Sequence, residues 1–209
     1  MRLRYWIKTG LRNGVTLMGA AAVFSLMMLL QSGKATLDDV LGMSVGYLVV
    51  FGIIMSMVFN MMVYKQNLPM VLSFGSSRKE AFIGLQFFRL IPMALVMAAA
   101  MVVMLLRGMD VGWQIPAGVG IALAVGAVGS GIGMVAIRFG KGFIIVCSAI
   151  IGFVFGLGGV ALMAFIFSAD VWQEVPDYIS WIVLAVGIAA HGISLIPERK
   201  IVYKYNVKL

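Results

Sequence analysis

Six long apolar segments constrain this chain more than any other feature of its sequence. They cover about residues 14–31, 40–63, 83–106, 115–137, 143–167 and 179–196. Each is close to the length of about 20 apolar residues that a helix needs to cross the hydrocarbon core of a bilayer. Only 11% of the 209 residues are charged and 62% are hydrophobic, which excludes an ordinary soluble domain. We predict an all-α integral membrane protein with six transmembrane helices, forming a single transmembrane domain over residues 1–209.

The first apolar segment has a second interpretation, as the core of a secretory signal peptide. Basic residues precede it, as they do in signal peptides. The stretch Val15–Leu30 is long for such a core, however, and the "QSGKA" that follows is a poor cleavage site. We therefore expect a retained transmembrane span.

The distribution of charge predicts an orientation. If the N-terminus is cytoplasmic, fourteen of the sixteen Lys and Arg residues fall on the inner side, and only Lys34 and Arg107 fall outside. Of the eight acidic residues, only Glu80 and Glu198 are then inside. This is the asymmetry of the positive-inside rule. We expect both termini, including a basic tail at 197–209, on the cytoplasmic side of a prokaryotic cell membrane.

The spans contain few ionisable groups by this assignment. All acidic residues are placed in loops or at span ends, whereas ion-driven transporters bury such groups because they carry the ion. We expect the single histidine, His191, to be hydrogen-bonded between helices, although sodium coupling through carbonyls and hydroxyls stays open. The lone Cys147 is interpreted as packing. With no catalytic or phosphate-binding motif, we predict that the chain is not an enzyme by itself and binds no cofactor or metal.

Glycine and methionine are abundant, with 25 and 17 residues. Three glycine pairs have GxxxG spacing, at residues 42–46, 129–133 and 152–156. Such spacing lets helix backbones approach closely in lipid, and packing within the chain is favoured over a dimer interface. The methionines are interpreted as packing or lipid-facing residues rather than as a substrate pathway. Pro92 is expected to bend or loosen the third span.

The first twelve residues alternate basic with apolar and aromatic side chains, "MRLRYWIKTGLR". A segment of this kind can lie along the membrane interface with its aromatic rings at headgroup depth. An interfacial helix over 1–12 is one interpretation of this segment. A simple topology anchor is the other interpretation, and the two are compatible.

A polar patch, "YKQNLPMVLSFGSSRKE", separates the second and third spans. Asn67 and Pro69 mark a plausible helix start, and Gly75 is a common helix stop. Ser77 precedes Glu80 by three residues, the spacing of a capping box that begins a new helix. The patch predicts a short helix near the membrane surface, a break and a capped restart.

The cations of the patch also permit a plainer interpretation. Arg78 and Lys79, together with Arg89, are expected to reach lipid headgroups on the inner side. On these residues alone, a well-made basic inner loop is slightly preferred to a docking element.

The stretch "LPMVLSFGSSRKEAFIG" resembles the cytoplasmic connection between the second and third spans in membrane subunits of ABC transporters of the type-2 exporter class. The resemblance implies that residues 1–12 form an elbow and that a short coupling helix docks on a separate ATPase subunit. The implied docking residues are Pro69, Met70, Val71, Leu72, Ser73 and Phe74. The implied joint and helix cap consist of Gly75, Ser76, Ser77, Arg78, Lys79 and Glu80.

The same resemblance implies ATP-driven export of a hydrophobic or amphipathic substrate. ATP and Mg would be bound by the ABC ATPase subunit and not by this chain. The other partners would be a second membrane subunit, the same chain or a homologous one, and the lipid bilayer, with no nucleic acid. The loop "SADVWQEVPDYIS" is shorter than the corresponding loop of many such subunits. A non-transporting membrane accessory or immunity factor is the alternative function.

Overall fold

The computed structural model describes residues 3–32, 36–73, 75–108, 114–139, 142–143, 146–147, 149–150 and 177–204. The long helices among them are α1 (Leu3–Ser32), α2 (Leu37–Ser73), α3 (Arg78–Leu106), α4 (Gln114–Phe139) and α7 (Asp177–Lys204). The predicted all-α class is confirmed for this part of the chain. Segments long and apolar enough to cross a membrane are Ser44–Tyr64, Arg78–Leu106, Gln114–Ile137 and Tyr178–Lys204. A multi-pass membrane protein is therefore supported.

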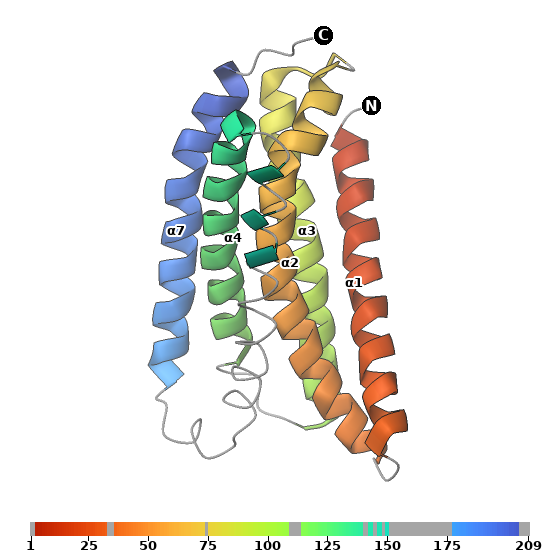
Figure 1. The fold of residues 1–209 in the computed structure, drawn as a ribbon. Coiled ribbons are helices and arrows are strands. Elements are labelled where there is room, and N and C mark those ends of the chain that lie inside the picture. Colours follow the sequence, from red (N-terminus) through yellow and green to blue (C-terminus); the bar gives the residue numbers. More distant parts are fainter. Residues whose placement is uncertain are drawn as a thin grey trace.

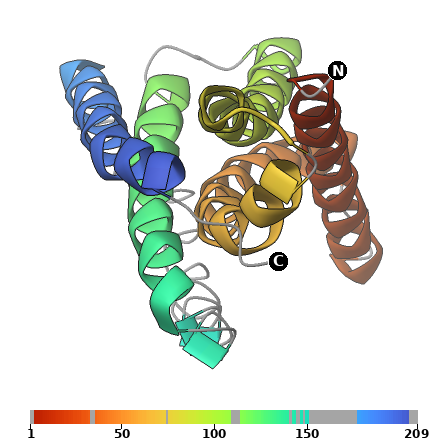
Figure 2. The ribbon, with the colours of Figure 1, turned by 90° about the horizontal axis from the view of Figure 1, so that it is seen from above.

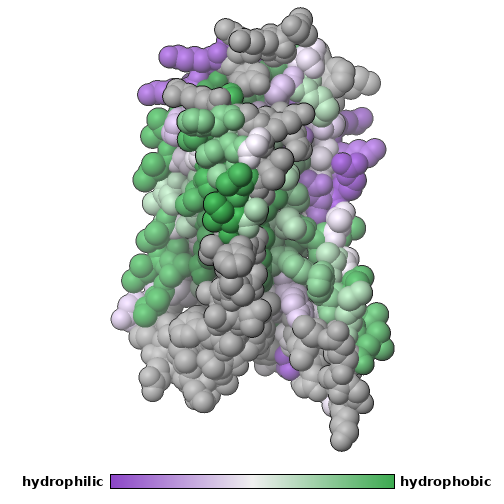
Figure 3. Space-filling model, in the orientation of Figure 1, coloured by the Kyte–Doolittle hydropathy of each residue, from purple (hydrophilic) through white to green (hydrophobic). Residues whose placement is uncertain are grey.

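The helices run up and down in one bundle (Figure 1). α1 and α3 run in one direction, and α2, α4 and α7 run in the other. The start of α1, the end of α2, the start of α3 and the end of α7 consequently lie together. We call this the basic end, because Arg4, Lys8, Lys79, Lys200 and Lys204 belong to its helix ends. Figure 3 shows hydrophilic residues gathered toward this end, with a mostly apolar surface along the rest of the visible face.

α2 is central in the bundle and packs against α1, α3 and α4, whereas α7 packs mainly on α4 (Figure 2). One buried cluster joins α1, α2 and α3 in the middle of the bundle, and consists of Leu17, Ala21, Val45, Leu48, Val96, Ala100 and Met104. A second cluster lies toward the basic end and includes Trp6, Val63, Tyr64, Leu68, Val71, Ala81, Leu85, Phe88 and Val202. The second cluster brings side chains of α1, α2, α3 and α7 together.

Glycines of α4 let it approach the backbone of α2. A Cβ at Gly133 would lie 2.7 Å from the carbonyl oxygen of Met61, and one at Gly129 would overlap the carbonyl oxygen of Met57. Because these atoms belong to the same chain, the 129–133 pair packs within the bundle, as expected. The 152–156 pair lies outside the described residues.

The expected elbow helix is wrong as a separate element. Residues 3–12 are the start of α1, which continues to Ser32 without a break. Trp6 is only 1% exposed, and its ring packs on α3 at Gly84 and Phe88. Gly10 also faces the α3 backbone closely, with its added Cβ 3.2 Å from the Phe87 carbonyl oxygen. Packing against α3 thus holds this segment upright in the bundle.

The expected separate coupling helix is also wrong, because α2 runs from Leu37 to Ser73 with Pro69 inside it. Tyr64, Leu68 and Val71 have the i, i+4, i+7 spacing of one helix face, and all three are buried in the same cluster. This shared stripe keeps the last turns in line with the second span. Pro69 removes a single backbone hydrogen bond near the helix end.

Two further expectations concern the C-terminal third. α7 continues through Pro197 to Lys204, so the first eight residues of the predicted tail 197–209 are helical and 205–209 lie outside the described residues. Most of the predicted fifth span, 143–167, also lies outside them, as does most of the loop before the sixth span. Cys147 is partly buried and packs near Met57 and Met61, which agrees with a packing role.

Candidate functional site

The joint between α2 and α3 is built from two local hydrogen-bond motifs. The Gly75 N–H donates to the Leu72 carbonyl at 2.9 Å, and the Ser76 N–H donates to the Val71 carbonyl at 3.3 Å. This pair of bonds is a Schellman motif, whose turning residue adopts a left-handed backbone. Gly75 has φ of 73°, a conformation that glycine adopts without steric cost. The predicted helix stop is confirmed.

The predicted capping box at the start of α3 is confirmed as well. The Glu80 backbone N–H donates to the Ser77 hydroxyl oxygen at 3.2 Å. In return, the Ser77 backbone N–H donates to the Glu80 carboxylate at 3.2 Å. Two long helices therefore meet at a short turn whose exposed polar groups are satisfied on both sides.

We expect Ser77→Ala to lower the free energy of unfolding by about 1 kcal/mol, because the Glu80 N–H loses its acceptor. The measurement is chemical denaturation in detergent micelles followed by circular dichroism. Ser73→Ala is the matched control, since the Ser73 hydroxyl only donates to the Met70 carbonyl at 2.7 Å, within the helix that it ends. Equal losses for the two variants would contradict a capping role for Ser77.

The residues that the resemblance assigns to docking differ in exposure. Val71 is buried and Leu72 is partly buried, and both pack on the chain's own core. Met70 and Ser73 are exposed and Pro69 is half-buried. Phe74 lies outside the described residues. Fewer of the implied docking residues are therefore exposed to a partner than the sequence suggests. Of the joint and cap set, Gly75, Ser77, Arg78, Lys79 and Glu80 are exposed and Ser76 is buried.

Arg78 connects the joint to another helix. Its guanidinium donates to the backbone carbonyl of Tyr203 in the last turn of α7. A cation is favourable there, because the last carbonyls of a helix lack partners and carry partial negative charge. The start of α3 is thus attached to the end of α7.

A buried ion pair holds the same two helices together deeper in the bundle. Arg89 Nη1 lies 2.7 Å from both Glu198 Oε1 and Oε2, and the two side chains are 2% and 0% exposed. Arg89 Nη2 donates to the Tyr64 hydroxyl at 2.6 Å. Gln86 Nε2 and the Ser194 hydroxyl donate to the Glu198 carboxylate at 3.1 and 3.3 Å. We call these five residues the charge cluster.

A row of polar side chains continues from the charge cluster between α2 and α4. The Ser130 hydroxyl is a hydrogen-bond neighbour of the Glu198 carboxylate and donates to Asn60 Oδ1 at 3.4 Å. Asn60 Nδ2 donates to the Ser56 carbonyl at 2.6 Å, and the Ser56 hydroxyl donates to the Ala122 carbonyl at 2.9 Å. We call Ser56, Asn60 and Ser130 the polar row.

These positions correct two expectations. Glu198 does not belong to an exposed tail, and Arg89 does not reach headgroups, because each is buried by the other's helix. The sequence carried a signal for this: His191, Ser194 and Glu198 stand at i, i+3 and i+7, the spacing of one helix face. Ionisable groups buried between membrane helices are costly and mark functional sites, so the charge cluster is a candidate site that our sequence interpretation missed.

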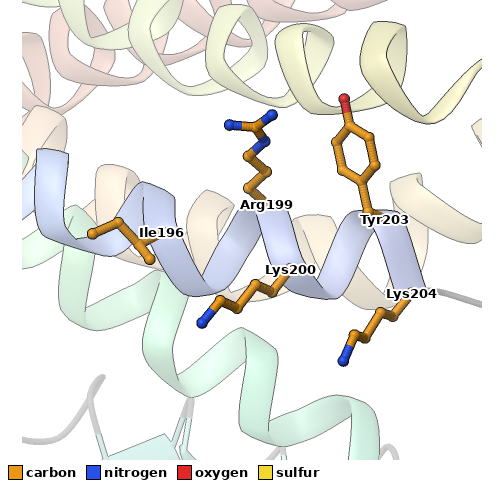
Figure 4. Close-up of a pocket in the computed structure, with 5 residues that line it drawn as sticks. All are labelled: Ile196, Arg199, Lys200, Tyr203 and Lys204. Carbon is orange, nitrogen blue, oxygen red and sulfur yellow. The ribbon is translucent and has the colours of Figure 1, made fainter.

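A shallow groove of about 450 Å³ lies on the surface of α7 near the basic end, lined by Ile196, Arg199, Lys200, Tyr203 and Lys204 (Figure 4). Arg199 and Tyr203 point to one side and Lys200 and Lys204 to the other. The Arg199 guanidinium lies 5.7 Å from the centroid of the Tyr203 ring. Because one helix supplies all its lining, the groove is a basic surface and not an internal chamber.

The described residues contain no group of three or more His, Cys, Asp or Glu side chains that could hold a metal ion. The charge cluster pairs charges and forms hydrogen bonds between α3 and α7. Comparisons with protein-family models, with curated proteins and with solved structures found no match to this chain.

Proposed function

We propose that this chain is the membrane-spanning subunit of an ATP-driven transporter that exports a hydrophobic or amphipathic substrate. ATP with Mg is hydrolysed by a separate subunit, which docks at the joint between α2 and α3, and a second membrane subunit completes the complex. One observation carries the proposal: two long helices meet at an exposed, doubly capped, cationic turn at the basic end of the bundle.

The joint has the mechanical properties that a lever requires. α2 is helical up to Ser73 and α3 is helical from Arg78, so a displacement at the turn passes into both helices without being absorbed in a long loop. The Arg78 bond to the Tyr203 carbonyl and the charge cluster extend the connection to α7. A partner that moves the joint would therefore move three helices.

Six spans and cytoplasmic termini are part of the proposal. α4 ends at the basic end, whereas α7 begins at the opposite end (Figure 1). The predicted fifth span, 143–167, together with α1, α2, α3, α4 and α7, makes six. The positive-inside rule then places the basic end, and with it the joint, in the cytoplasm.

The exposed part of the joint fits an apolar groove with an acidic rim. Met70 offers an exposed, flexible apolar side chain of the type that adapts to partner surfaces. Arg78 and Lys79 supply positive charge a few residues away. Central apolar anchors carry most of the affinity in protein interfaces, and rim charges mainly set specificity and association rate.

We expect Met70→Glu to weaken association with the ATPase by about tenfold or more, because an interface anchor becomes a buried, unpaired carboxylate. The chain is co-expressed with a candidate ATPase subunit, chosen as a neighbouring open reading frame with a Walker A loop and an ABC signature sequence, and both co-purification and stimulated ATP hydrolysis are measured. Lys79→Glu is expected to slow association at low salt.

Lys8→Glu is the matched control for Lys79→Glu, since Lys8 is an exposed cation at the basic end but lies on α1. It changes the net charge of the chain by the same amount. Undiminished co-purification and ATP hydrolysis with Met70→Glu would contradict docking at the joint. If Lys79→Glu and Lys8→Glu slow association equally, Lys79 acts only through the net charge of the chain.

A further inference from the structure

We infer that the C-terminal part of α7 is a gate over the polar row, and that the Arg89–Glu198 ion pair is the latch that keeps the gate closed. This goes beyond the proposed function, because it concerns helices of this chain alone and needs no ATPase. The inference follows from how α7 is held at its two ends.

The first half of α7 is fixed to α4 by direct backbone contact. A Cβ at Gly187 would overlap the Gly120 carbonyl oxygen, and one at Gly120 would lie 2.5 Å from the Val183 carbonyl oxygen. Contacts this close occur only where two helix backbones touch. The Gly120–Gly187 crossing therefore fixes α7 on α4 at one point and forms the natural pivot of the helix.

The second half of α7 also makes polar contacts with α3. Glu198 binds Arg89 and Gln86, and the Tyr203 carbonyl binds Arg78. Val202 adds an apolar contact to the core. Water can replace the partners of such polar groups, so these contacts can break and form again.

The polar atoms around the Arg89–Glu198 ion pair are not all satisfied. Arg89 Nε and Gln86 Oε1 are buried without a hydrogen-bond partner within the described part of the chain. Unsatisfied groups of this kind raise the free energy of the closed arrangement. A buried ion pair also gains little net stability over its hydrated, separated charges. Both effects lower the cost of opening.

Opening the latch would uncover the polar row. Ser130 is 1% exposed and Asn60 is 4% exposed, and Ser130 neighbours the Glu198 carboxylate directly. Displacement of Glu198 removes the group that covers Ser130 from the α7 side. Water would then reach Ser130, at the end of the polar row nearest to the charge cluster.

Cysteine accessibility tests this gate in liposomes containing the full chain, with Cys147→Ser as background. Ser130→Cys reports on the polar row and Ser25→Cys is the control, since Ser25 is buried in α1 at 2% exposure. Each is combined with Arg89→Ala plus Glu198→Ala, which removes the latch without leaving a lone charge or an apolar contact in its place, or with the charge swap Arg89→Glu plus Glu198→Arg. The probe is a charged, water-soluble methanethiosulfonate.

We expect the cysteine at 130 to react about tenfold faster, or more, when both alanines are present, because the open population rises as the contacts between α3 and α7 are lost. The charge swap is expected to restore protection, and the cysteine at 25 to stay protected throughout. Unchanged protection of position 130 in the double alanine variant would overturn the gate. Equal acceleration at positions 25 and 130 would also overturn it, because the whole bundle would then have loosened.

Discussion

Glu198→Gln is expected to destabilise the helix bundle by about 3–5 kcal/mol, because it leaves the Arg89 guanidinium buried without a counter-charge. The wild-type carboxylate is fully buried and lies 2.7 Å from Arg89 Nη1. Glutamine has nearly the same shape, so the loss reports the charge and not a cavity. The free energy of unfolding in detergent micelles, from denaturant titration followed by circular dichroism, measures the effect.

Glu80→Gln is the matched control for this charge removal. Glu80 is exposed, and glutamine can replace glutamate at the third position of a capping box. We expect a change within about 0.5 kcal/mol for this variant. Arg89→Leu combined with Glu198→Leu is expected to recover most of the lost stability, because no lone charge remains. Similar values for Glu80→Gln and Glu198→Gln would show that the carboxylate of Glu198 is not buried against Arg89.

Trp6→Ala is expected to cost about 3–5 kcal/mol, as large aromatic truncations in cores do. Trp6 is 1% exposed, makes an edge-to-face contact with Phe88 at 5.9 Å between ring centroids, and lies against Gly84, where a Cβ would overlap its ring. Chemical denaturation in micelles again gives the free energy.

Trp181→Ala provides the control for this truncation, since Trp181 is 58% exposed on α7. Loss of an exposed side chain is expected to change the free energy of unfolding by about 0.5 kcal/mol or less. If Trp6 instead lay at headgroup depth on an interfacial elbow, the two tryptophan variants would behave alike. The comparison therefore distinguishes a continuous α1 from a separate elbow.

Local features of the joint could be predicted because their hydrogen bonds are local. Ser77 and Glu80 are three residues apart and satisfy each other, and Gly75 turns the chain through bonds to residues a few positions earlier. Such motifs depend only on the residues that form them. The long apolar segments of α2, α3, α4 and α7 could also be predicted from the sequence, since the bilayer fixes the length of a span.

The charge cluster could not be derived in the same way, because Arg89 and Glu198 are 109 residues apart. The predicted basic tail began at Pro197, whereas α7 is continuous through that residue. The polar spacing of His191, Ser194 and Glu198 indicated a polar helix face. Its partner helix depends on how α3 and α7 pack, which no short stretch of sequence specifies.

The position of the N-terminal segment also depends on helix packing that its own sequence does not specify. "MRLRYWIK" has the composition of an interfacial segment, yet Gly84 accepts the Trp6 ring and Gly10 brings α1 close to α3. The position of Trp6 therefore depends on glycines of both packed helices, α1 and α3. The docking partner and the substrate remain predictions from the resemblance and from the geometry of the joint.

The membrane side of the joint is the central claim, since an ATPase can dock only where ATP is present. The direct measurement is labelling of Lys79→Cys, in the Cys147→Ser background, with a membrane-impermeant maleimide in intact cells and in inverted membrane vesicles. Lys79 is exposed, so accessibility depends on the side of the membrane. We expect labelling in the inverted vesicles and none in intact cells. Labelling in intact cells would place the joint outside and contradict both the orientation and the ATP-driven mechanism.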